Sequence, residues 1–144
     1  MKICSVLLFT ALTALSTFAQ NNLKSVTPTY KPDAALSYRV EFDGDPSFTS
    51  VTLTFNSPGP FPIDQPGLTN GFGLNHFVKV KAGVYDVDGR IPSNVITGDY
   101  QLVTVNTSID PASKQYDAKS QNIRIHIDNG AKYDFPPLKS VKPN

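Results

Sequence analysis

Two histidines and several closely spaced aspartates carry the most reactive side chains of this 144-residue sequence. Either histidine could act as a general base, because a Ser/His/Asp arrangement needs only proximity in space. However, His126 alternates with Arg124 and Asp128, which places it on a solvated sheet surface. His76 stands where a loop meets a strand and is expected to be a packed end residue. We therefore predict a protein that is not an enzyme, with a small secreted hydrolase as the weaker alternative.

Two acidic pairs could bind a metal ion. Asp43 and Asp45 are two positions apart, as are Asp86 and Asp88, and calcium prefers several oxygen ligands in such segments. Neither segment completes an EF-hand pattern, and aspartate and glycine are also the usual residues of turns. We expect plain turns, with no metal and no cofactor.

The irregular segment 57–73 is the strongest candidate for ligand binding. It is rich in proline and glycine, and few loops of this length lack a role. Aromatic rings offer flat apolar area and amides offer paired donors and acceptors, which suits a sugar ring or a partner protein. The alternative is that Phe61 and Phe72 fill one end of the core, and the absence of tryptophan weakens the sugar interpretation. The candidate ligand-binding residues are Phe61, Asp64, Gln65, Asn70, Phe72 and Asn75.

The first 19 residues have the pattern of a signal peptide. Lys2 precedes an apolar stretch, and Thr17 and Ala19 are small residues at the positions that a signal peptidase reads. The stretch is too short and too rich in Thr and Ser for a comfortable membrane span. Cys4, the single cysteine, would leave with the signal, so no disulfide is expected. We predict a secreted or periplasmic protein with no membrane attachment after cleavage.

Charge and composition limit the partners and the fold. Without residues 1–19, which hold one basic and no acidic residue, the 12 acidic groups are balanced by the remaining basic ones. This balance argues against nucleic acid, leaving an unknown protein or polysaccharide as partner. Helix formers are scarce, with Glu41 as the single glutamate, whereas Val, Thr, Ser and Pro are abundant. Period-two alternation or strand-like composition predicts strands over residues 36–42, 51–55, 76–81, 84–91, 100–105 and 122–127.

Several finer predictions follow the same alternation. In residues 76–81, Val78 and Val80 are expected to face inward, with Phe77 either exposed or shifted by a bulge. Residues 106–120 read as a polar connection. A turn at residues 128–130 would pair residues 125 and 123 with 133 and 135 in a hairpin.

Residues 91–102 carry a resemblance to a known family. They resemble the corner between strands E and F of immunoglobulin-like and fibronectin-type-III-like modules, where a tyrosine opens strand F and its hydroxyl reaches back to the corner backbone. Tyr100 matches that tyrosine. Leu102 matches the second cysteine of antibody-type domains, and Leu53 is the candidate for the position of the first one, on strand B. The resemblance implies an all-β, antiparallel immunoglobulin-like β-sandwich of about seven strands.

The expected organisation is a signal peptide (1–19), a leader or edge strand (20–35), the sandwich (36–135) and a C-terminal tail or linker (136–144). The phrase Leu-Lys-Ser-Val occurs at residues 23–26 and again at 138–141, which suggests a tandem module, two similar edge strands or coincidence. Modules of this kind mostly serve as spacers, adhesion units or binding domains. We expect a non-catalytic structural, adhesion or protein-interaction role, with a polysaccharide-binding module that uses residues 57–73 as the alternative.

Overall fold

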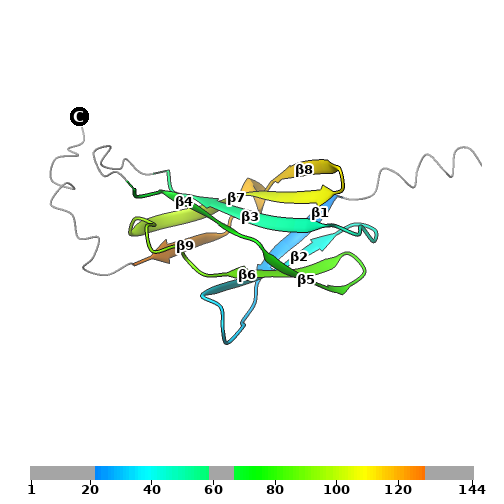
Figure 1. Cartoon of the computed structure of the whole chain (residues 1–144), viewed down its shortest axis with the longest axis horizontal. Coiled ribbons are helices and arrows are strands. Elements are labelled where there is room, and N and C mark those ends of the chain that lie inside the picture. Colours follow the sequence, from blue (N-terminus) through cyan, green and yellow to red (C-terminus); the bar gives the residue numbers. More distant parts are fainter. Residues whose placement is uncertain (1–21, 59–66, 129–144) are drawn as a thin grey trace, which may run out of the picture.

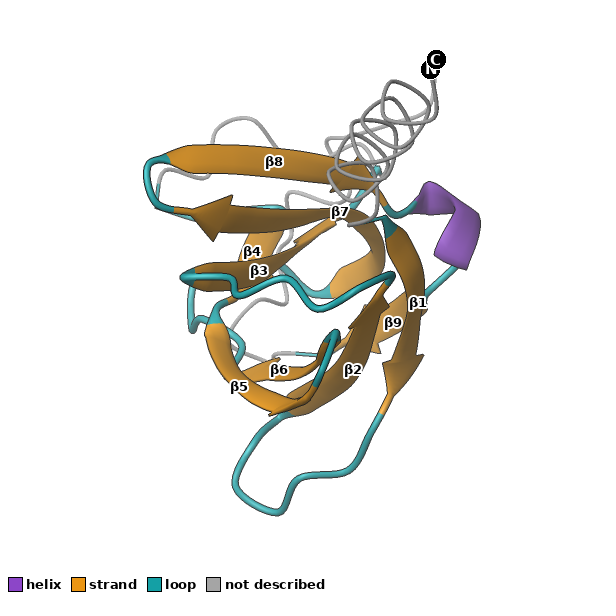
Figure 2. Ribbon diagram, turned by 90° about the vertical axis from the view of Figure 1, so that its right-hand side faces the viewer, coloured by secondary structure: helices purple, strands orange, loops and turns teal. Residues whose placement is uncertain are grey.

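The chain forms two antiparallel sheets that face each other, because alternate apolar side chains of the strands are buried between them. The computed structural model describes residues 22–58 and 67–128, and within them it places nine strands and one short 3₁₀ helix. Sheet A has the order β1 (Leu23–Pro28), β2 (Leu36–Phe42), β6 (Val84–Gly89) and β5 (His76–Lys81). Sheet B has the order β4 (Gly71–Leu74), β3 (Ser50–Asn56), β7 (Gly98–Ile109) and β8 (Ala112–Asp117), and β9 (Arg124–Ile127) also pairs with β7. The all-β antiparallel sandwich is therefore confirmed, with nine described strands instead of about seven (Figures 1 and 2).

The core lies between the sheets and is rich in aromatic rings. Tyr38 of β2 and Phe55 of β3 meet across the two layers, with their ring centroids 5.6 Å apart. Phe55 also stacks on Phe72 of β4 at 5.1 Å, with the ring planes 7° apart. Leu53 and Leu102 are fully buried in the same core, and burial of such large apolar side chains is the main favourable contribution to folding.

The last two strands act together as one interrupted edge. The 12-residue β7 pairs with β8 over its second half and with β9 over its first half. Between them, the amide of Ala118 donates to the carbonyl of Val103, and that of Leu102 donates to the carbonyl of Ile123. Hydrogen bonds to β7 therefore continue directly before and directly after the short helix η1 (Lys119–Gln121), which separates β8 from β9.

Three sequence predictions about strands are wrong. Residues 106–120 are not a polar connection, because β7 continues to Ile109 and β8 follows. The segment 57–73 ends in part of strand β4, whose alternation is hidden by its two glycines. In β5, Val78 and Val80 are 50% and 45% exposed, and it is Phe77 that packs against the core.

The expected position of Leu53 is also wrong. Leu53 lies on β3, which pairs directly with β7, so it shares a sheet with Leu102. The position of the first cysteine would have to lie in the opposite sheet. The second strand in chain order is β2, in sheet A, and its central Val40 is fully buried. For residues 20–35, where a leader or an edge strand was expected, the structure has the edge strand: β1 lies at the edge of sheet A, so the sandwich begins before residue 36. The signal, the 128–130 hairpin and the second Leu-Lys-Ser-Val phrase lie wholly or partly outside the described residues.

Candidate binding site

The outer surface of sheet B is covered by small and medium polar side chains. Because alternate residues point to opposite faces of a sheet, the neighbours of the buried core residues on β3, β7, β8 and β9 point outward. Register places them in rows that cross the strands, such as Thr54, Thr104 and Asp117. We call this surface the polar face; its members are Thr52, Thr54, Asn56, Asp99, Gln101, Thr104, Asn106, Gln115, Asp117, Arg124 and His126.

Side-chain hydrogen bonds order the middle of the polar face. The amide nitrogen of Asn106 donates to the hydroxyl oxygens of Thr54 and Thr104, each at 3.2 Å. A threonine hydroxyl that accepts a bond keeps its own hydrogen for a second partner. The two hydroxyls can therefore donate to a molecule lying on the sheet.

One hollow of the polar face lies where β7 pairs with β9. This β9 depression has a volume of about 460 Å³. Register sets Asp99 opposite His126 and Gln101 opposite Arg124, which brings four planar polar groups together. Its lining consists of Pro58, Asp99, Tyr100, Gln101, Arg124, Ile125 and His126.

The histidine of the β9 depression is held by a carboxylate. Asp99 Oδ1 lies 2.7 Å from Nδ1 of His126, which matches the way an acidic group orients a catalytic imidazole. Both side chains are open to solvent, with 62% of His126 and 87% of Asp99 exposed. Water screens such a pair, so the contact serves mainly to orient the ring. Both side chains are accessible for hydrogen bonds to a ligand.

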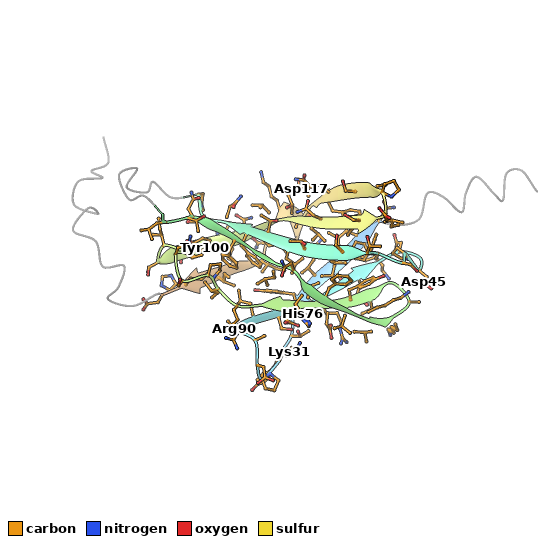
Figure 3. All side chains as sticks on the ribbon, viewed as in Figure 1. Lys31, Asp45, His76, Arg90, Tyr100 and Asp117 are labelled. Carbon is orange, nitrogen blue, oxygen red and sulfur yellow. The ribbon has the colours of Figure 1, made fainter. Side chains whose placement is uncertain are left out.

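A second hollow lies on the same face, beside β8. This β8 depression measures about 380 Å³ and is lined by Val103, Thr104, Gln115, Asp117 and Lys119. Asp117 Oδ1 accepts a 2.9 Å bond from the backbone amide of Lys119, which fixes the carboxylate at the start of η1. Figure 3 shows Asp117 on the opposite side of the sandwich from His76 and Lys31.

The outer surface of sheet A carries a buried carboxylate instead. Asp88 is 7% exposed and receives a 2.8 Å bond from the Lys31 ammonium, and its oxygens lie 3.2 Å from His76 Nδ1. Burial raises the pKa of Asp88, but the bonds from Lys31 and His76 outweigh it, so the pKa lies below its usual value. His76 itself is exposed, so its prediction as a packed end residue is wrong. This cluster ties the β1–β2 loop to β6.

Two of the other three aspartates of the acidic pairs are also bonded to cations, and the expectation of plain turns is wrong for Asp86 and Asp88, which lie on strand β6. Asp86 binds Arg39 through two bonds of 2.9 and 3.1 Å, and Asp45 binds Lys79 at 2.7 Å. Within the described part of the chain, no three His, Cys, Asp or Glu side chains gather as a metal site would require.

The structure separates the predicted ligand residues. Phe72 is 7% exposed and stacks in the core, so its expected role in ligand binding is wrong and the core-filling alternative holds for it. Asn70 and Asn75 are exposed at the two ends of β4. Phe61, Asp64 and Gln65 lie outside the described residues. Tyr100 and Leu102 are buried, as their expected structural roles require.

Sequence reasoning missed the residues of both depressions. The alternation of residues 122–127 did indicate that Arg124 and His126 face solvent. Asp99 and Gln101 join them only through the pairing of β9 with β7, over a separation of 27 residues between Asp99 and His126. Local periodicity does not report such a register.

Comparisons with protein-family models, curated proteins and solved structures find no match for this chain. Among residues 22–58 and 67–128, no helix has the length and apolar character needed to cross a membrane.

Proposed function

We propose that this chain is an exported, non-catalytic immunoglobulin-like module that binds its partner through the polar face. Export rests on the signal-like residues 1–19, and a secreted or periplasmic location follows from it. The observation that carries the binding role is the β9 depression, into which polar side chains of two strands converge.

The strand order supports the immunoglobulin-like assignment. Lettered along the chain, sheet A has the order A-B-E-D and sheet B has the order C′-C-F-G. Constant-type immunoglobulin domains place A, B, E and D in one sheet and C, F and G in the other. In this lettering β2 is strand B and β3 is strand C.

The tyrosine of the corner supports it as well. Tyr100 lies near the start of β7, the strand lettered F, and its hydroxyl donates to the carbonyl of Ile96, four residues upstream. A tyrosine in that strand bonded to the preceding corner is a hallmark of these sandwiches.

A sheet face is a suitable platform for recognition. Side chains on paired strands are held by the ladder, so less conformational entropy is lost when a partner binds. The guanidinium of Arg124 contributes donors, Asp99 contributes acceptors, and Gln101 contributes both. All three project from the paired residues of β7 and β9.

The test is retention of envelope material on the immobilised exported protein. We expect the wild type to retain a component that Arg124→Ala loses and that Lys24→Ala, a substitution at an exposed position of β1, keeps. Retention that all three share, or none by the wild type, would overturn the proposal. Turnover of an ester, peptide or glycan that His126→Ala abolishes would make the protein an enzyme instead.

A further inference from the structure

The two depressions of the polar face repeat the same chemistry. The β9 depression combines the carboxylate of Asp99, the amide of Gln101 and the guanidinium of Arg124. The β8 depression combines the carboxylate of Asp117, the amide of Gln115 and the ammonium of Lys119. In each hollow one carboxylate lies with one Arg or Lys cation and one amide, and the β9 depression also holds the imidazole of His126, which is bonded to Asp99.

The repeats also share one strand. The β9 depression includes Gln101 and the β8 depression includes Thr104, both on β7. Three residues of extended chain separate them by roughly 10 Å. A ligand that presents the same groups at intervals along its length could occupy both hollows at once.

The polar face favours a hydroxyl-rich ligand over a protein. Protein interfaces have an apolar core with aromatic anchors. In the described part of the chain, the exposed large apolar side chains lie elsewhere: Tyr30 in the β1–β2 loop, Val78 and Val80 on β5, and Ile109 at the end of β7. Carboxylates, amides and the Thr54 and Thr104 hydroxyls instead match the paired donors and acceptors of sugar rings.

We propose that the polar face binds a neutral polysaccharide chain that lies along β7 and fills both depressions. The balanced charge of each hollow is what selects a neutral chain over an acidic one. This inference rests on the proposed binding role and adds the ligand class and its path. It differs from a site in the 57–73 segment, because its hydrogen-bonding groups come from β7, β8, β9 and η1.

Affinity electrophoresis of the exported protein tests the ligand class. Native gels would contain galactomannan, mixed-linkage β-glucan, xyloglucan or dextran as neutral polymers, and alginate or polygalacturonate as acidic ones. We expect at least one neutral polymer to retard the wild type and Lys24→Ala equally, and Gln101→Ala and Gln115→Ala less. Retardation by acidic polymers alone, or by none, overturns the inference.

Oligosaccharides of the retained polymer test the path. Titration from disaccharide to hexasaccharide should show affinity rising with length, because only a longer chain reaches the second depression. Each glutamine substitution should weaken hexasaccharide binding about 5-fold to 10-fold, and one of the two should leave disaccharide binding unchanged. An affinity independent of length, or a loss equal in Lys24→Ala, overturns the proposed path.

Failure of the polysaccharide proposal can be distinguished from failure of the proposed binding role. Envelope material that Arg124→Ala loses, together with no retardation by any polymer, would refute the polysaccharide and leave the module a binder of something else. Self-association of the wild type that Gln115→Ala abolishes would assign the polar face to a second copy of the chain, and would also refute the polysaccharide.

Discussion

The hydroxyl of Tyr100 donates a 2.5 Å hydrogen bond to the main-chain carbonyl of Ile96, across the turn that leads from sheet A into β7. The tyrosine side chain is 1% exposed and the isoleucine is 6% exposed, so water does not compete for this carbonyl. The bond therefore fixes the corner at which the chain crosses between the two layers, directly before the strand that carries both depressions.

Tyr100→Phe should destabilise the protein. The substitution keeps the buried ring but leaves the Ile96 carbonyl without this donor, which typically costs about 1–3 kcal/mol. Urea unfolding would measure the change. Tyr30→Phe is the matched control, because Tyr30 is 80% exposed and its substitution should leave the unfolding midpoint unchanged. Equal midpoints for the wild type and both variants would contradict the role of the corner bond.

Tyr100 should also make the fold sensitive to alkali. Burial raises the pKa of Tyr100 from 10.0 to about 12, so the folded state holds the phenol neutral where the unfolded chain would ionise. Its contribution is complete below pH 10 and is lost as the pH rises toward 12. Between those values the unfolding free energy of the wild type should fall more steeply than that of Tyr100→Phe. Parallel profiles would count against this assignment.

Alternation predicted the strands that have one face on the core. Residues 36–42 and 51–55 were assigned correctly because the core buries every second side chain, including Val40, Val51 and Leu53. Strand β8 was not predicted, because it is an edge strand and Tyr116 is its one buried side chain. A single apolar residue has no period, so the strand exists only through its pairing with β7.

The candidate site was predictable only in part for the same reason. Residues 122–127 showed which side chains face solvent, but not which strand lies beside them. The polar face is assembled by register between β7 and its neighbours, a long-range property. The ligand site was therefore predicted in the segment 57–73. One of the two aromatic residues of that segment, Phe72, lies in the core.

Register in β5 can be tested by paired substitutions. Pairing with β6 sets Phe77 opposite the buried Val87, so Phe77 faces the core. Val78 and Val80 face solvent instead, although alternation predicted that these two valines would be buried. Phe77→Ala should cost roughly 1–3 kcal/mol of unfolding free energy, whereas Val78→Ala should cost less than about 0.5 kcal/mol. Thermal or urea unfolding of the two variants decides between the registers, and the reverse order of costs would restore the one that alternation predicted.

Asp88 should make the fold sensitive to acid. Because its pKa is held below the usual 3.8, its contribution is present above that value and is lost as the pH falls through the folded pKa. Asp88→Asn should lower stability by about 1–3 kcal/mol at neutral pH, since Lys31 and His76 lose a charged partner, and should flatten the acid limb of the profile. Asp43→Asn, at an exposed position, is the control. An unchanged acid limb in Asp88→Asn would refute this role.

Gly83 should tolerate no side chain in the turn between β5 and β6. Its φ of +71° is one that other residues rarely adopt, and an added Cβ would lie 2.5 Å from the Gly44 carbonyl oxygen and 2.7 Å from that of Phe42. Its own carbonyl accepts a 2.8 Å bond from the Phe42 amide, so the turn cannot move away without breaking that bond. Gly83→Ala should therefore destabilise by at least about 1–3 kcal/mol in urea unfolding. Gly73→Ala is the control and should be tolerated, because its Cβ would lie 3.5 Å from the nearest atom, which is an ordinary contact. Equal losses of stability in the two variants would contradict this account of Gly83.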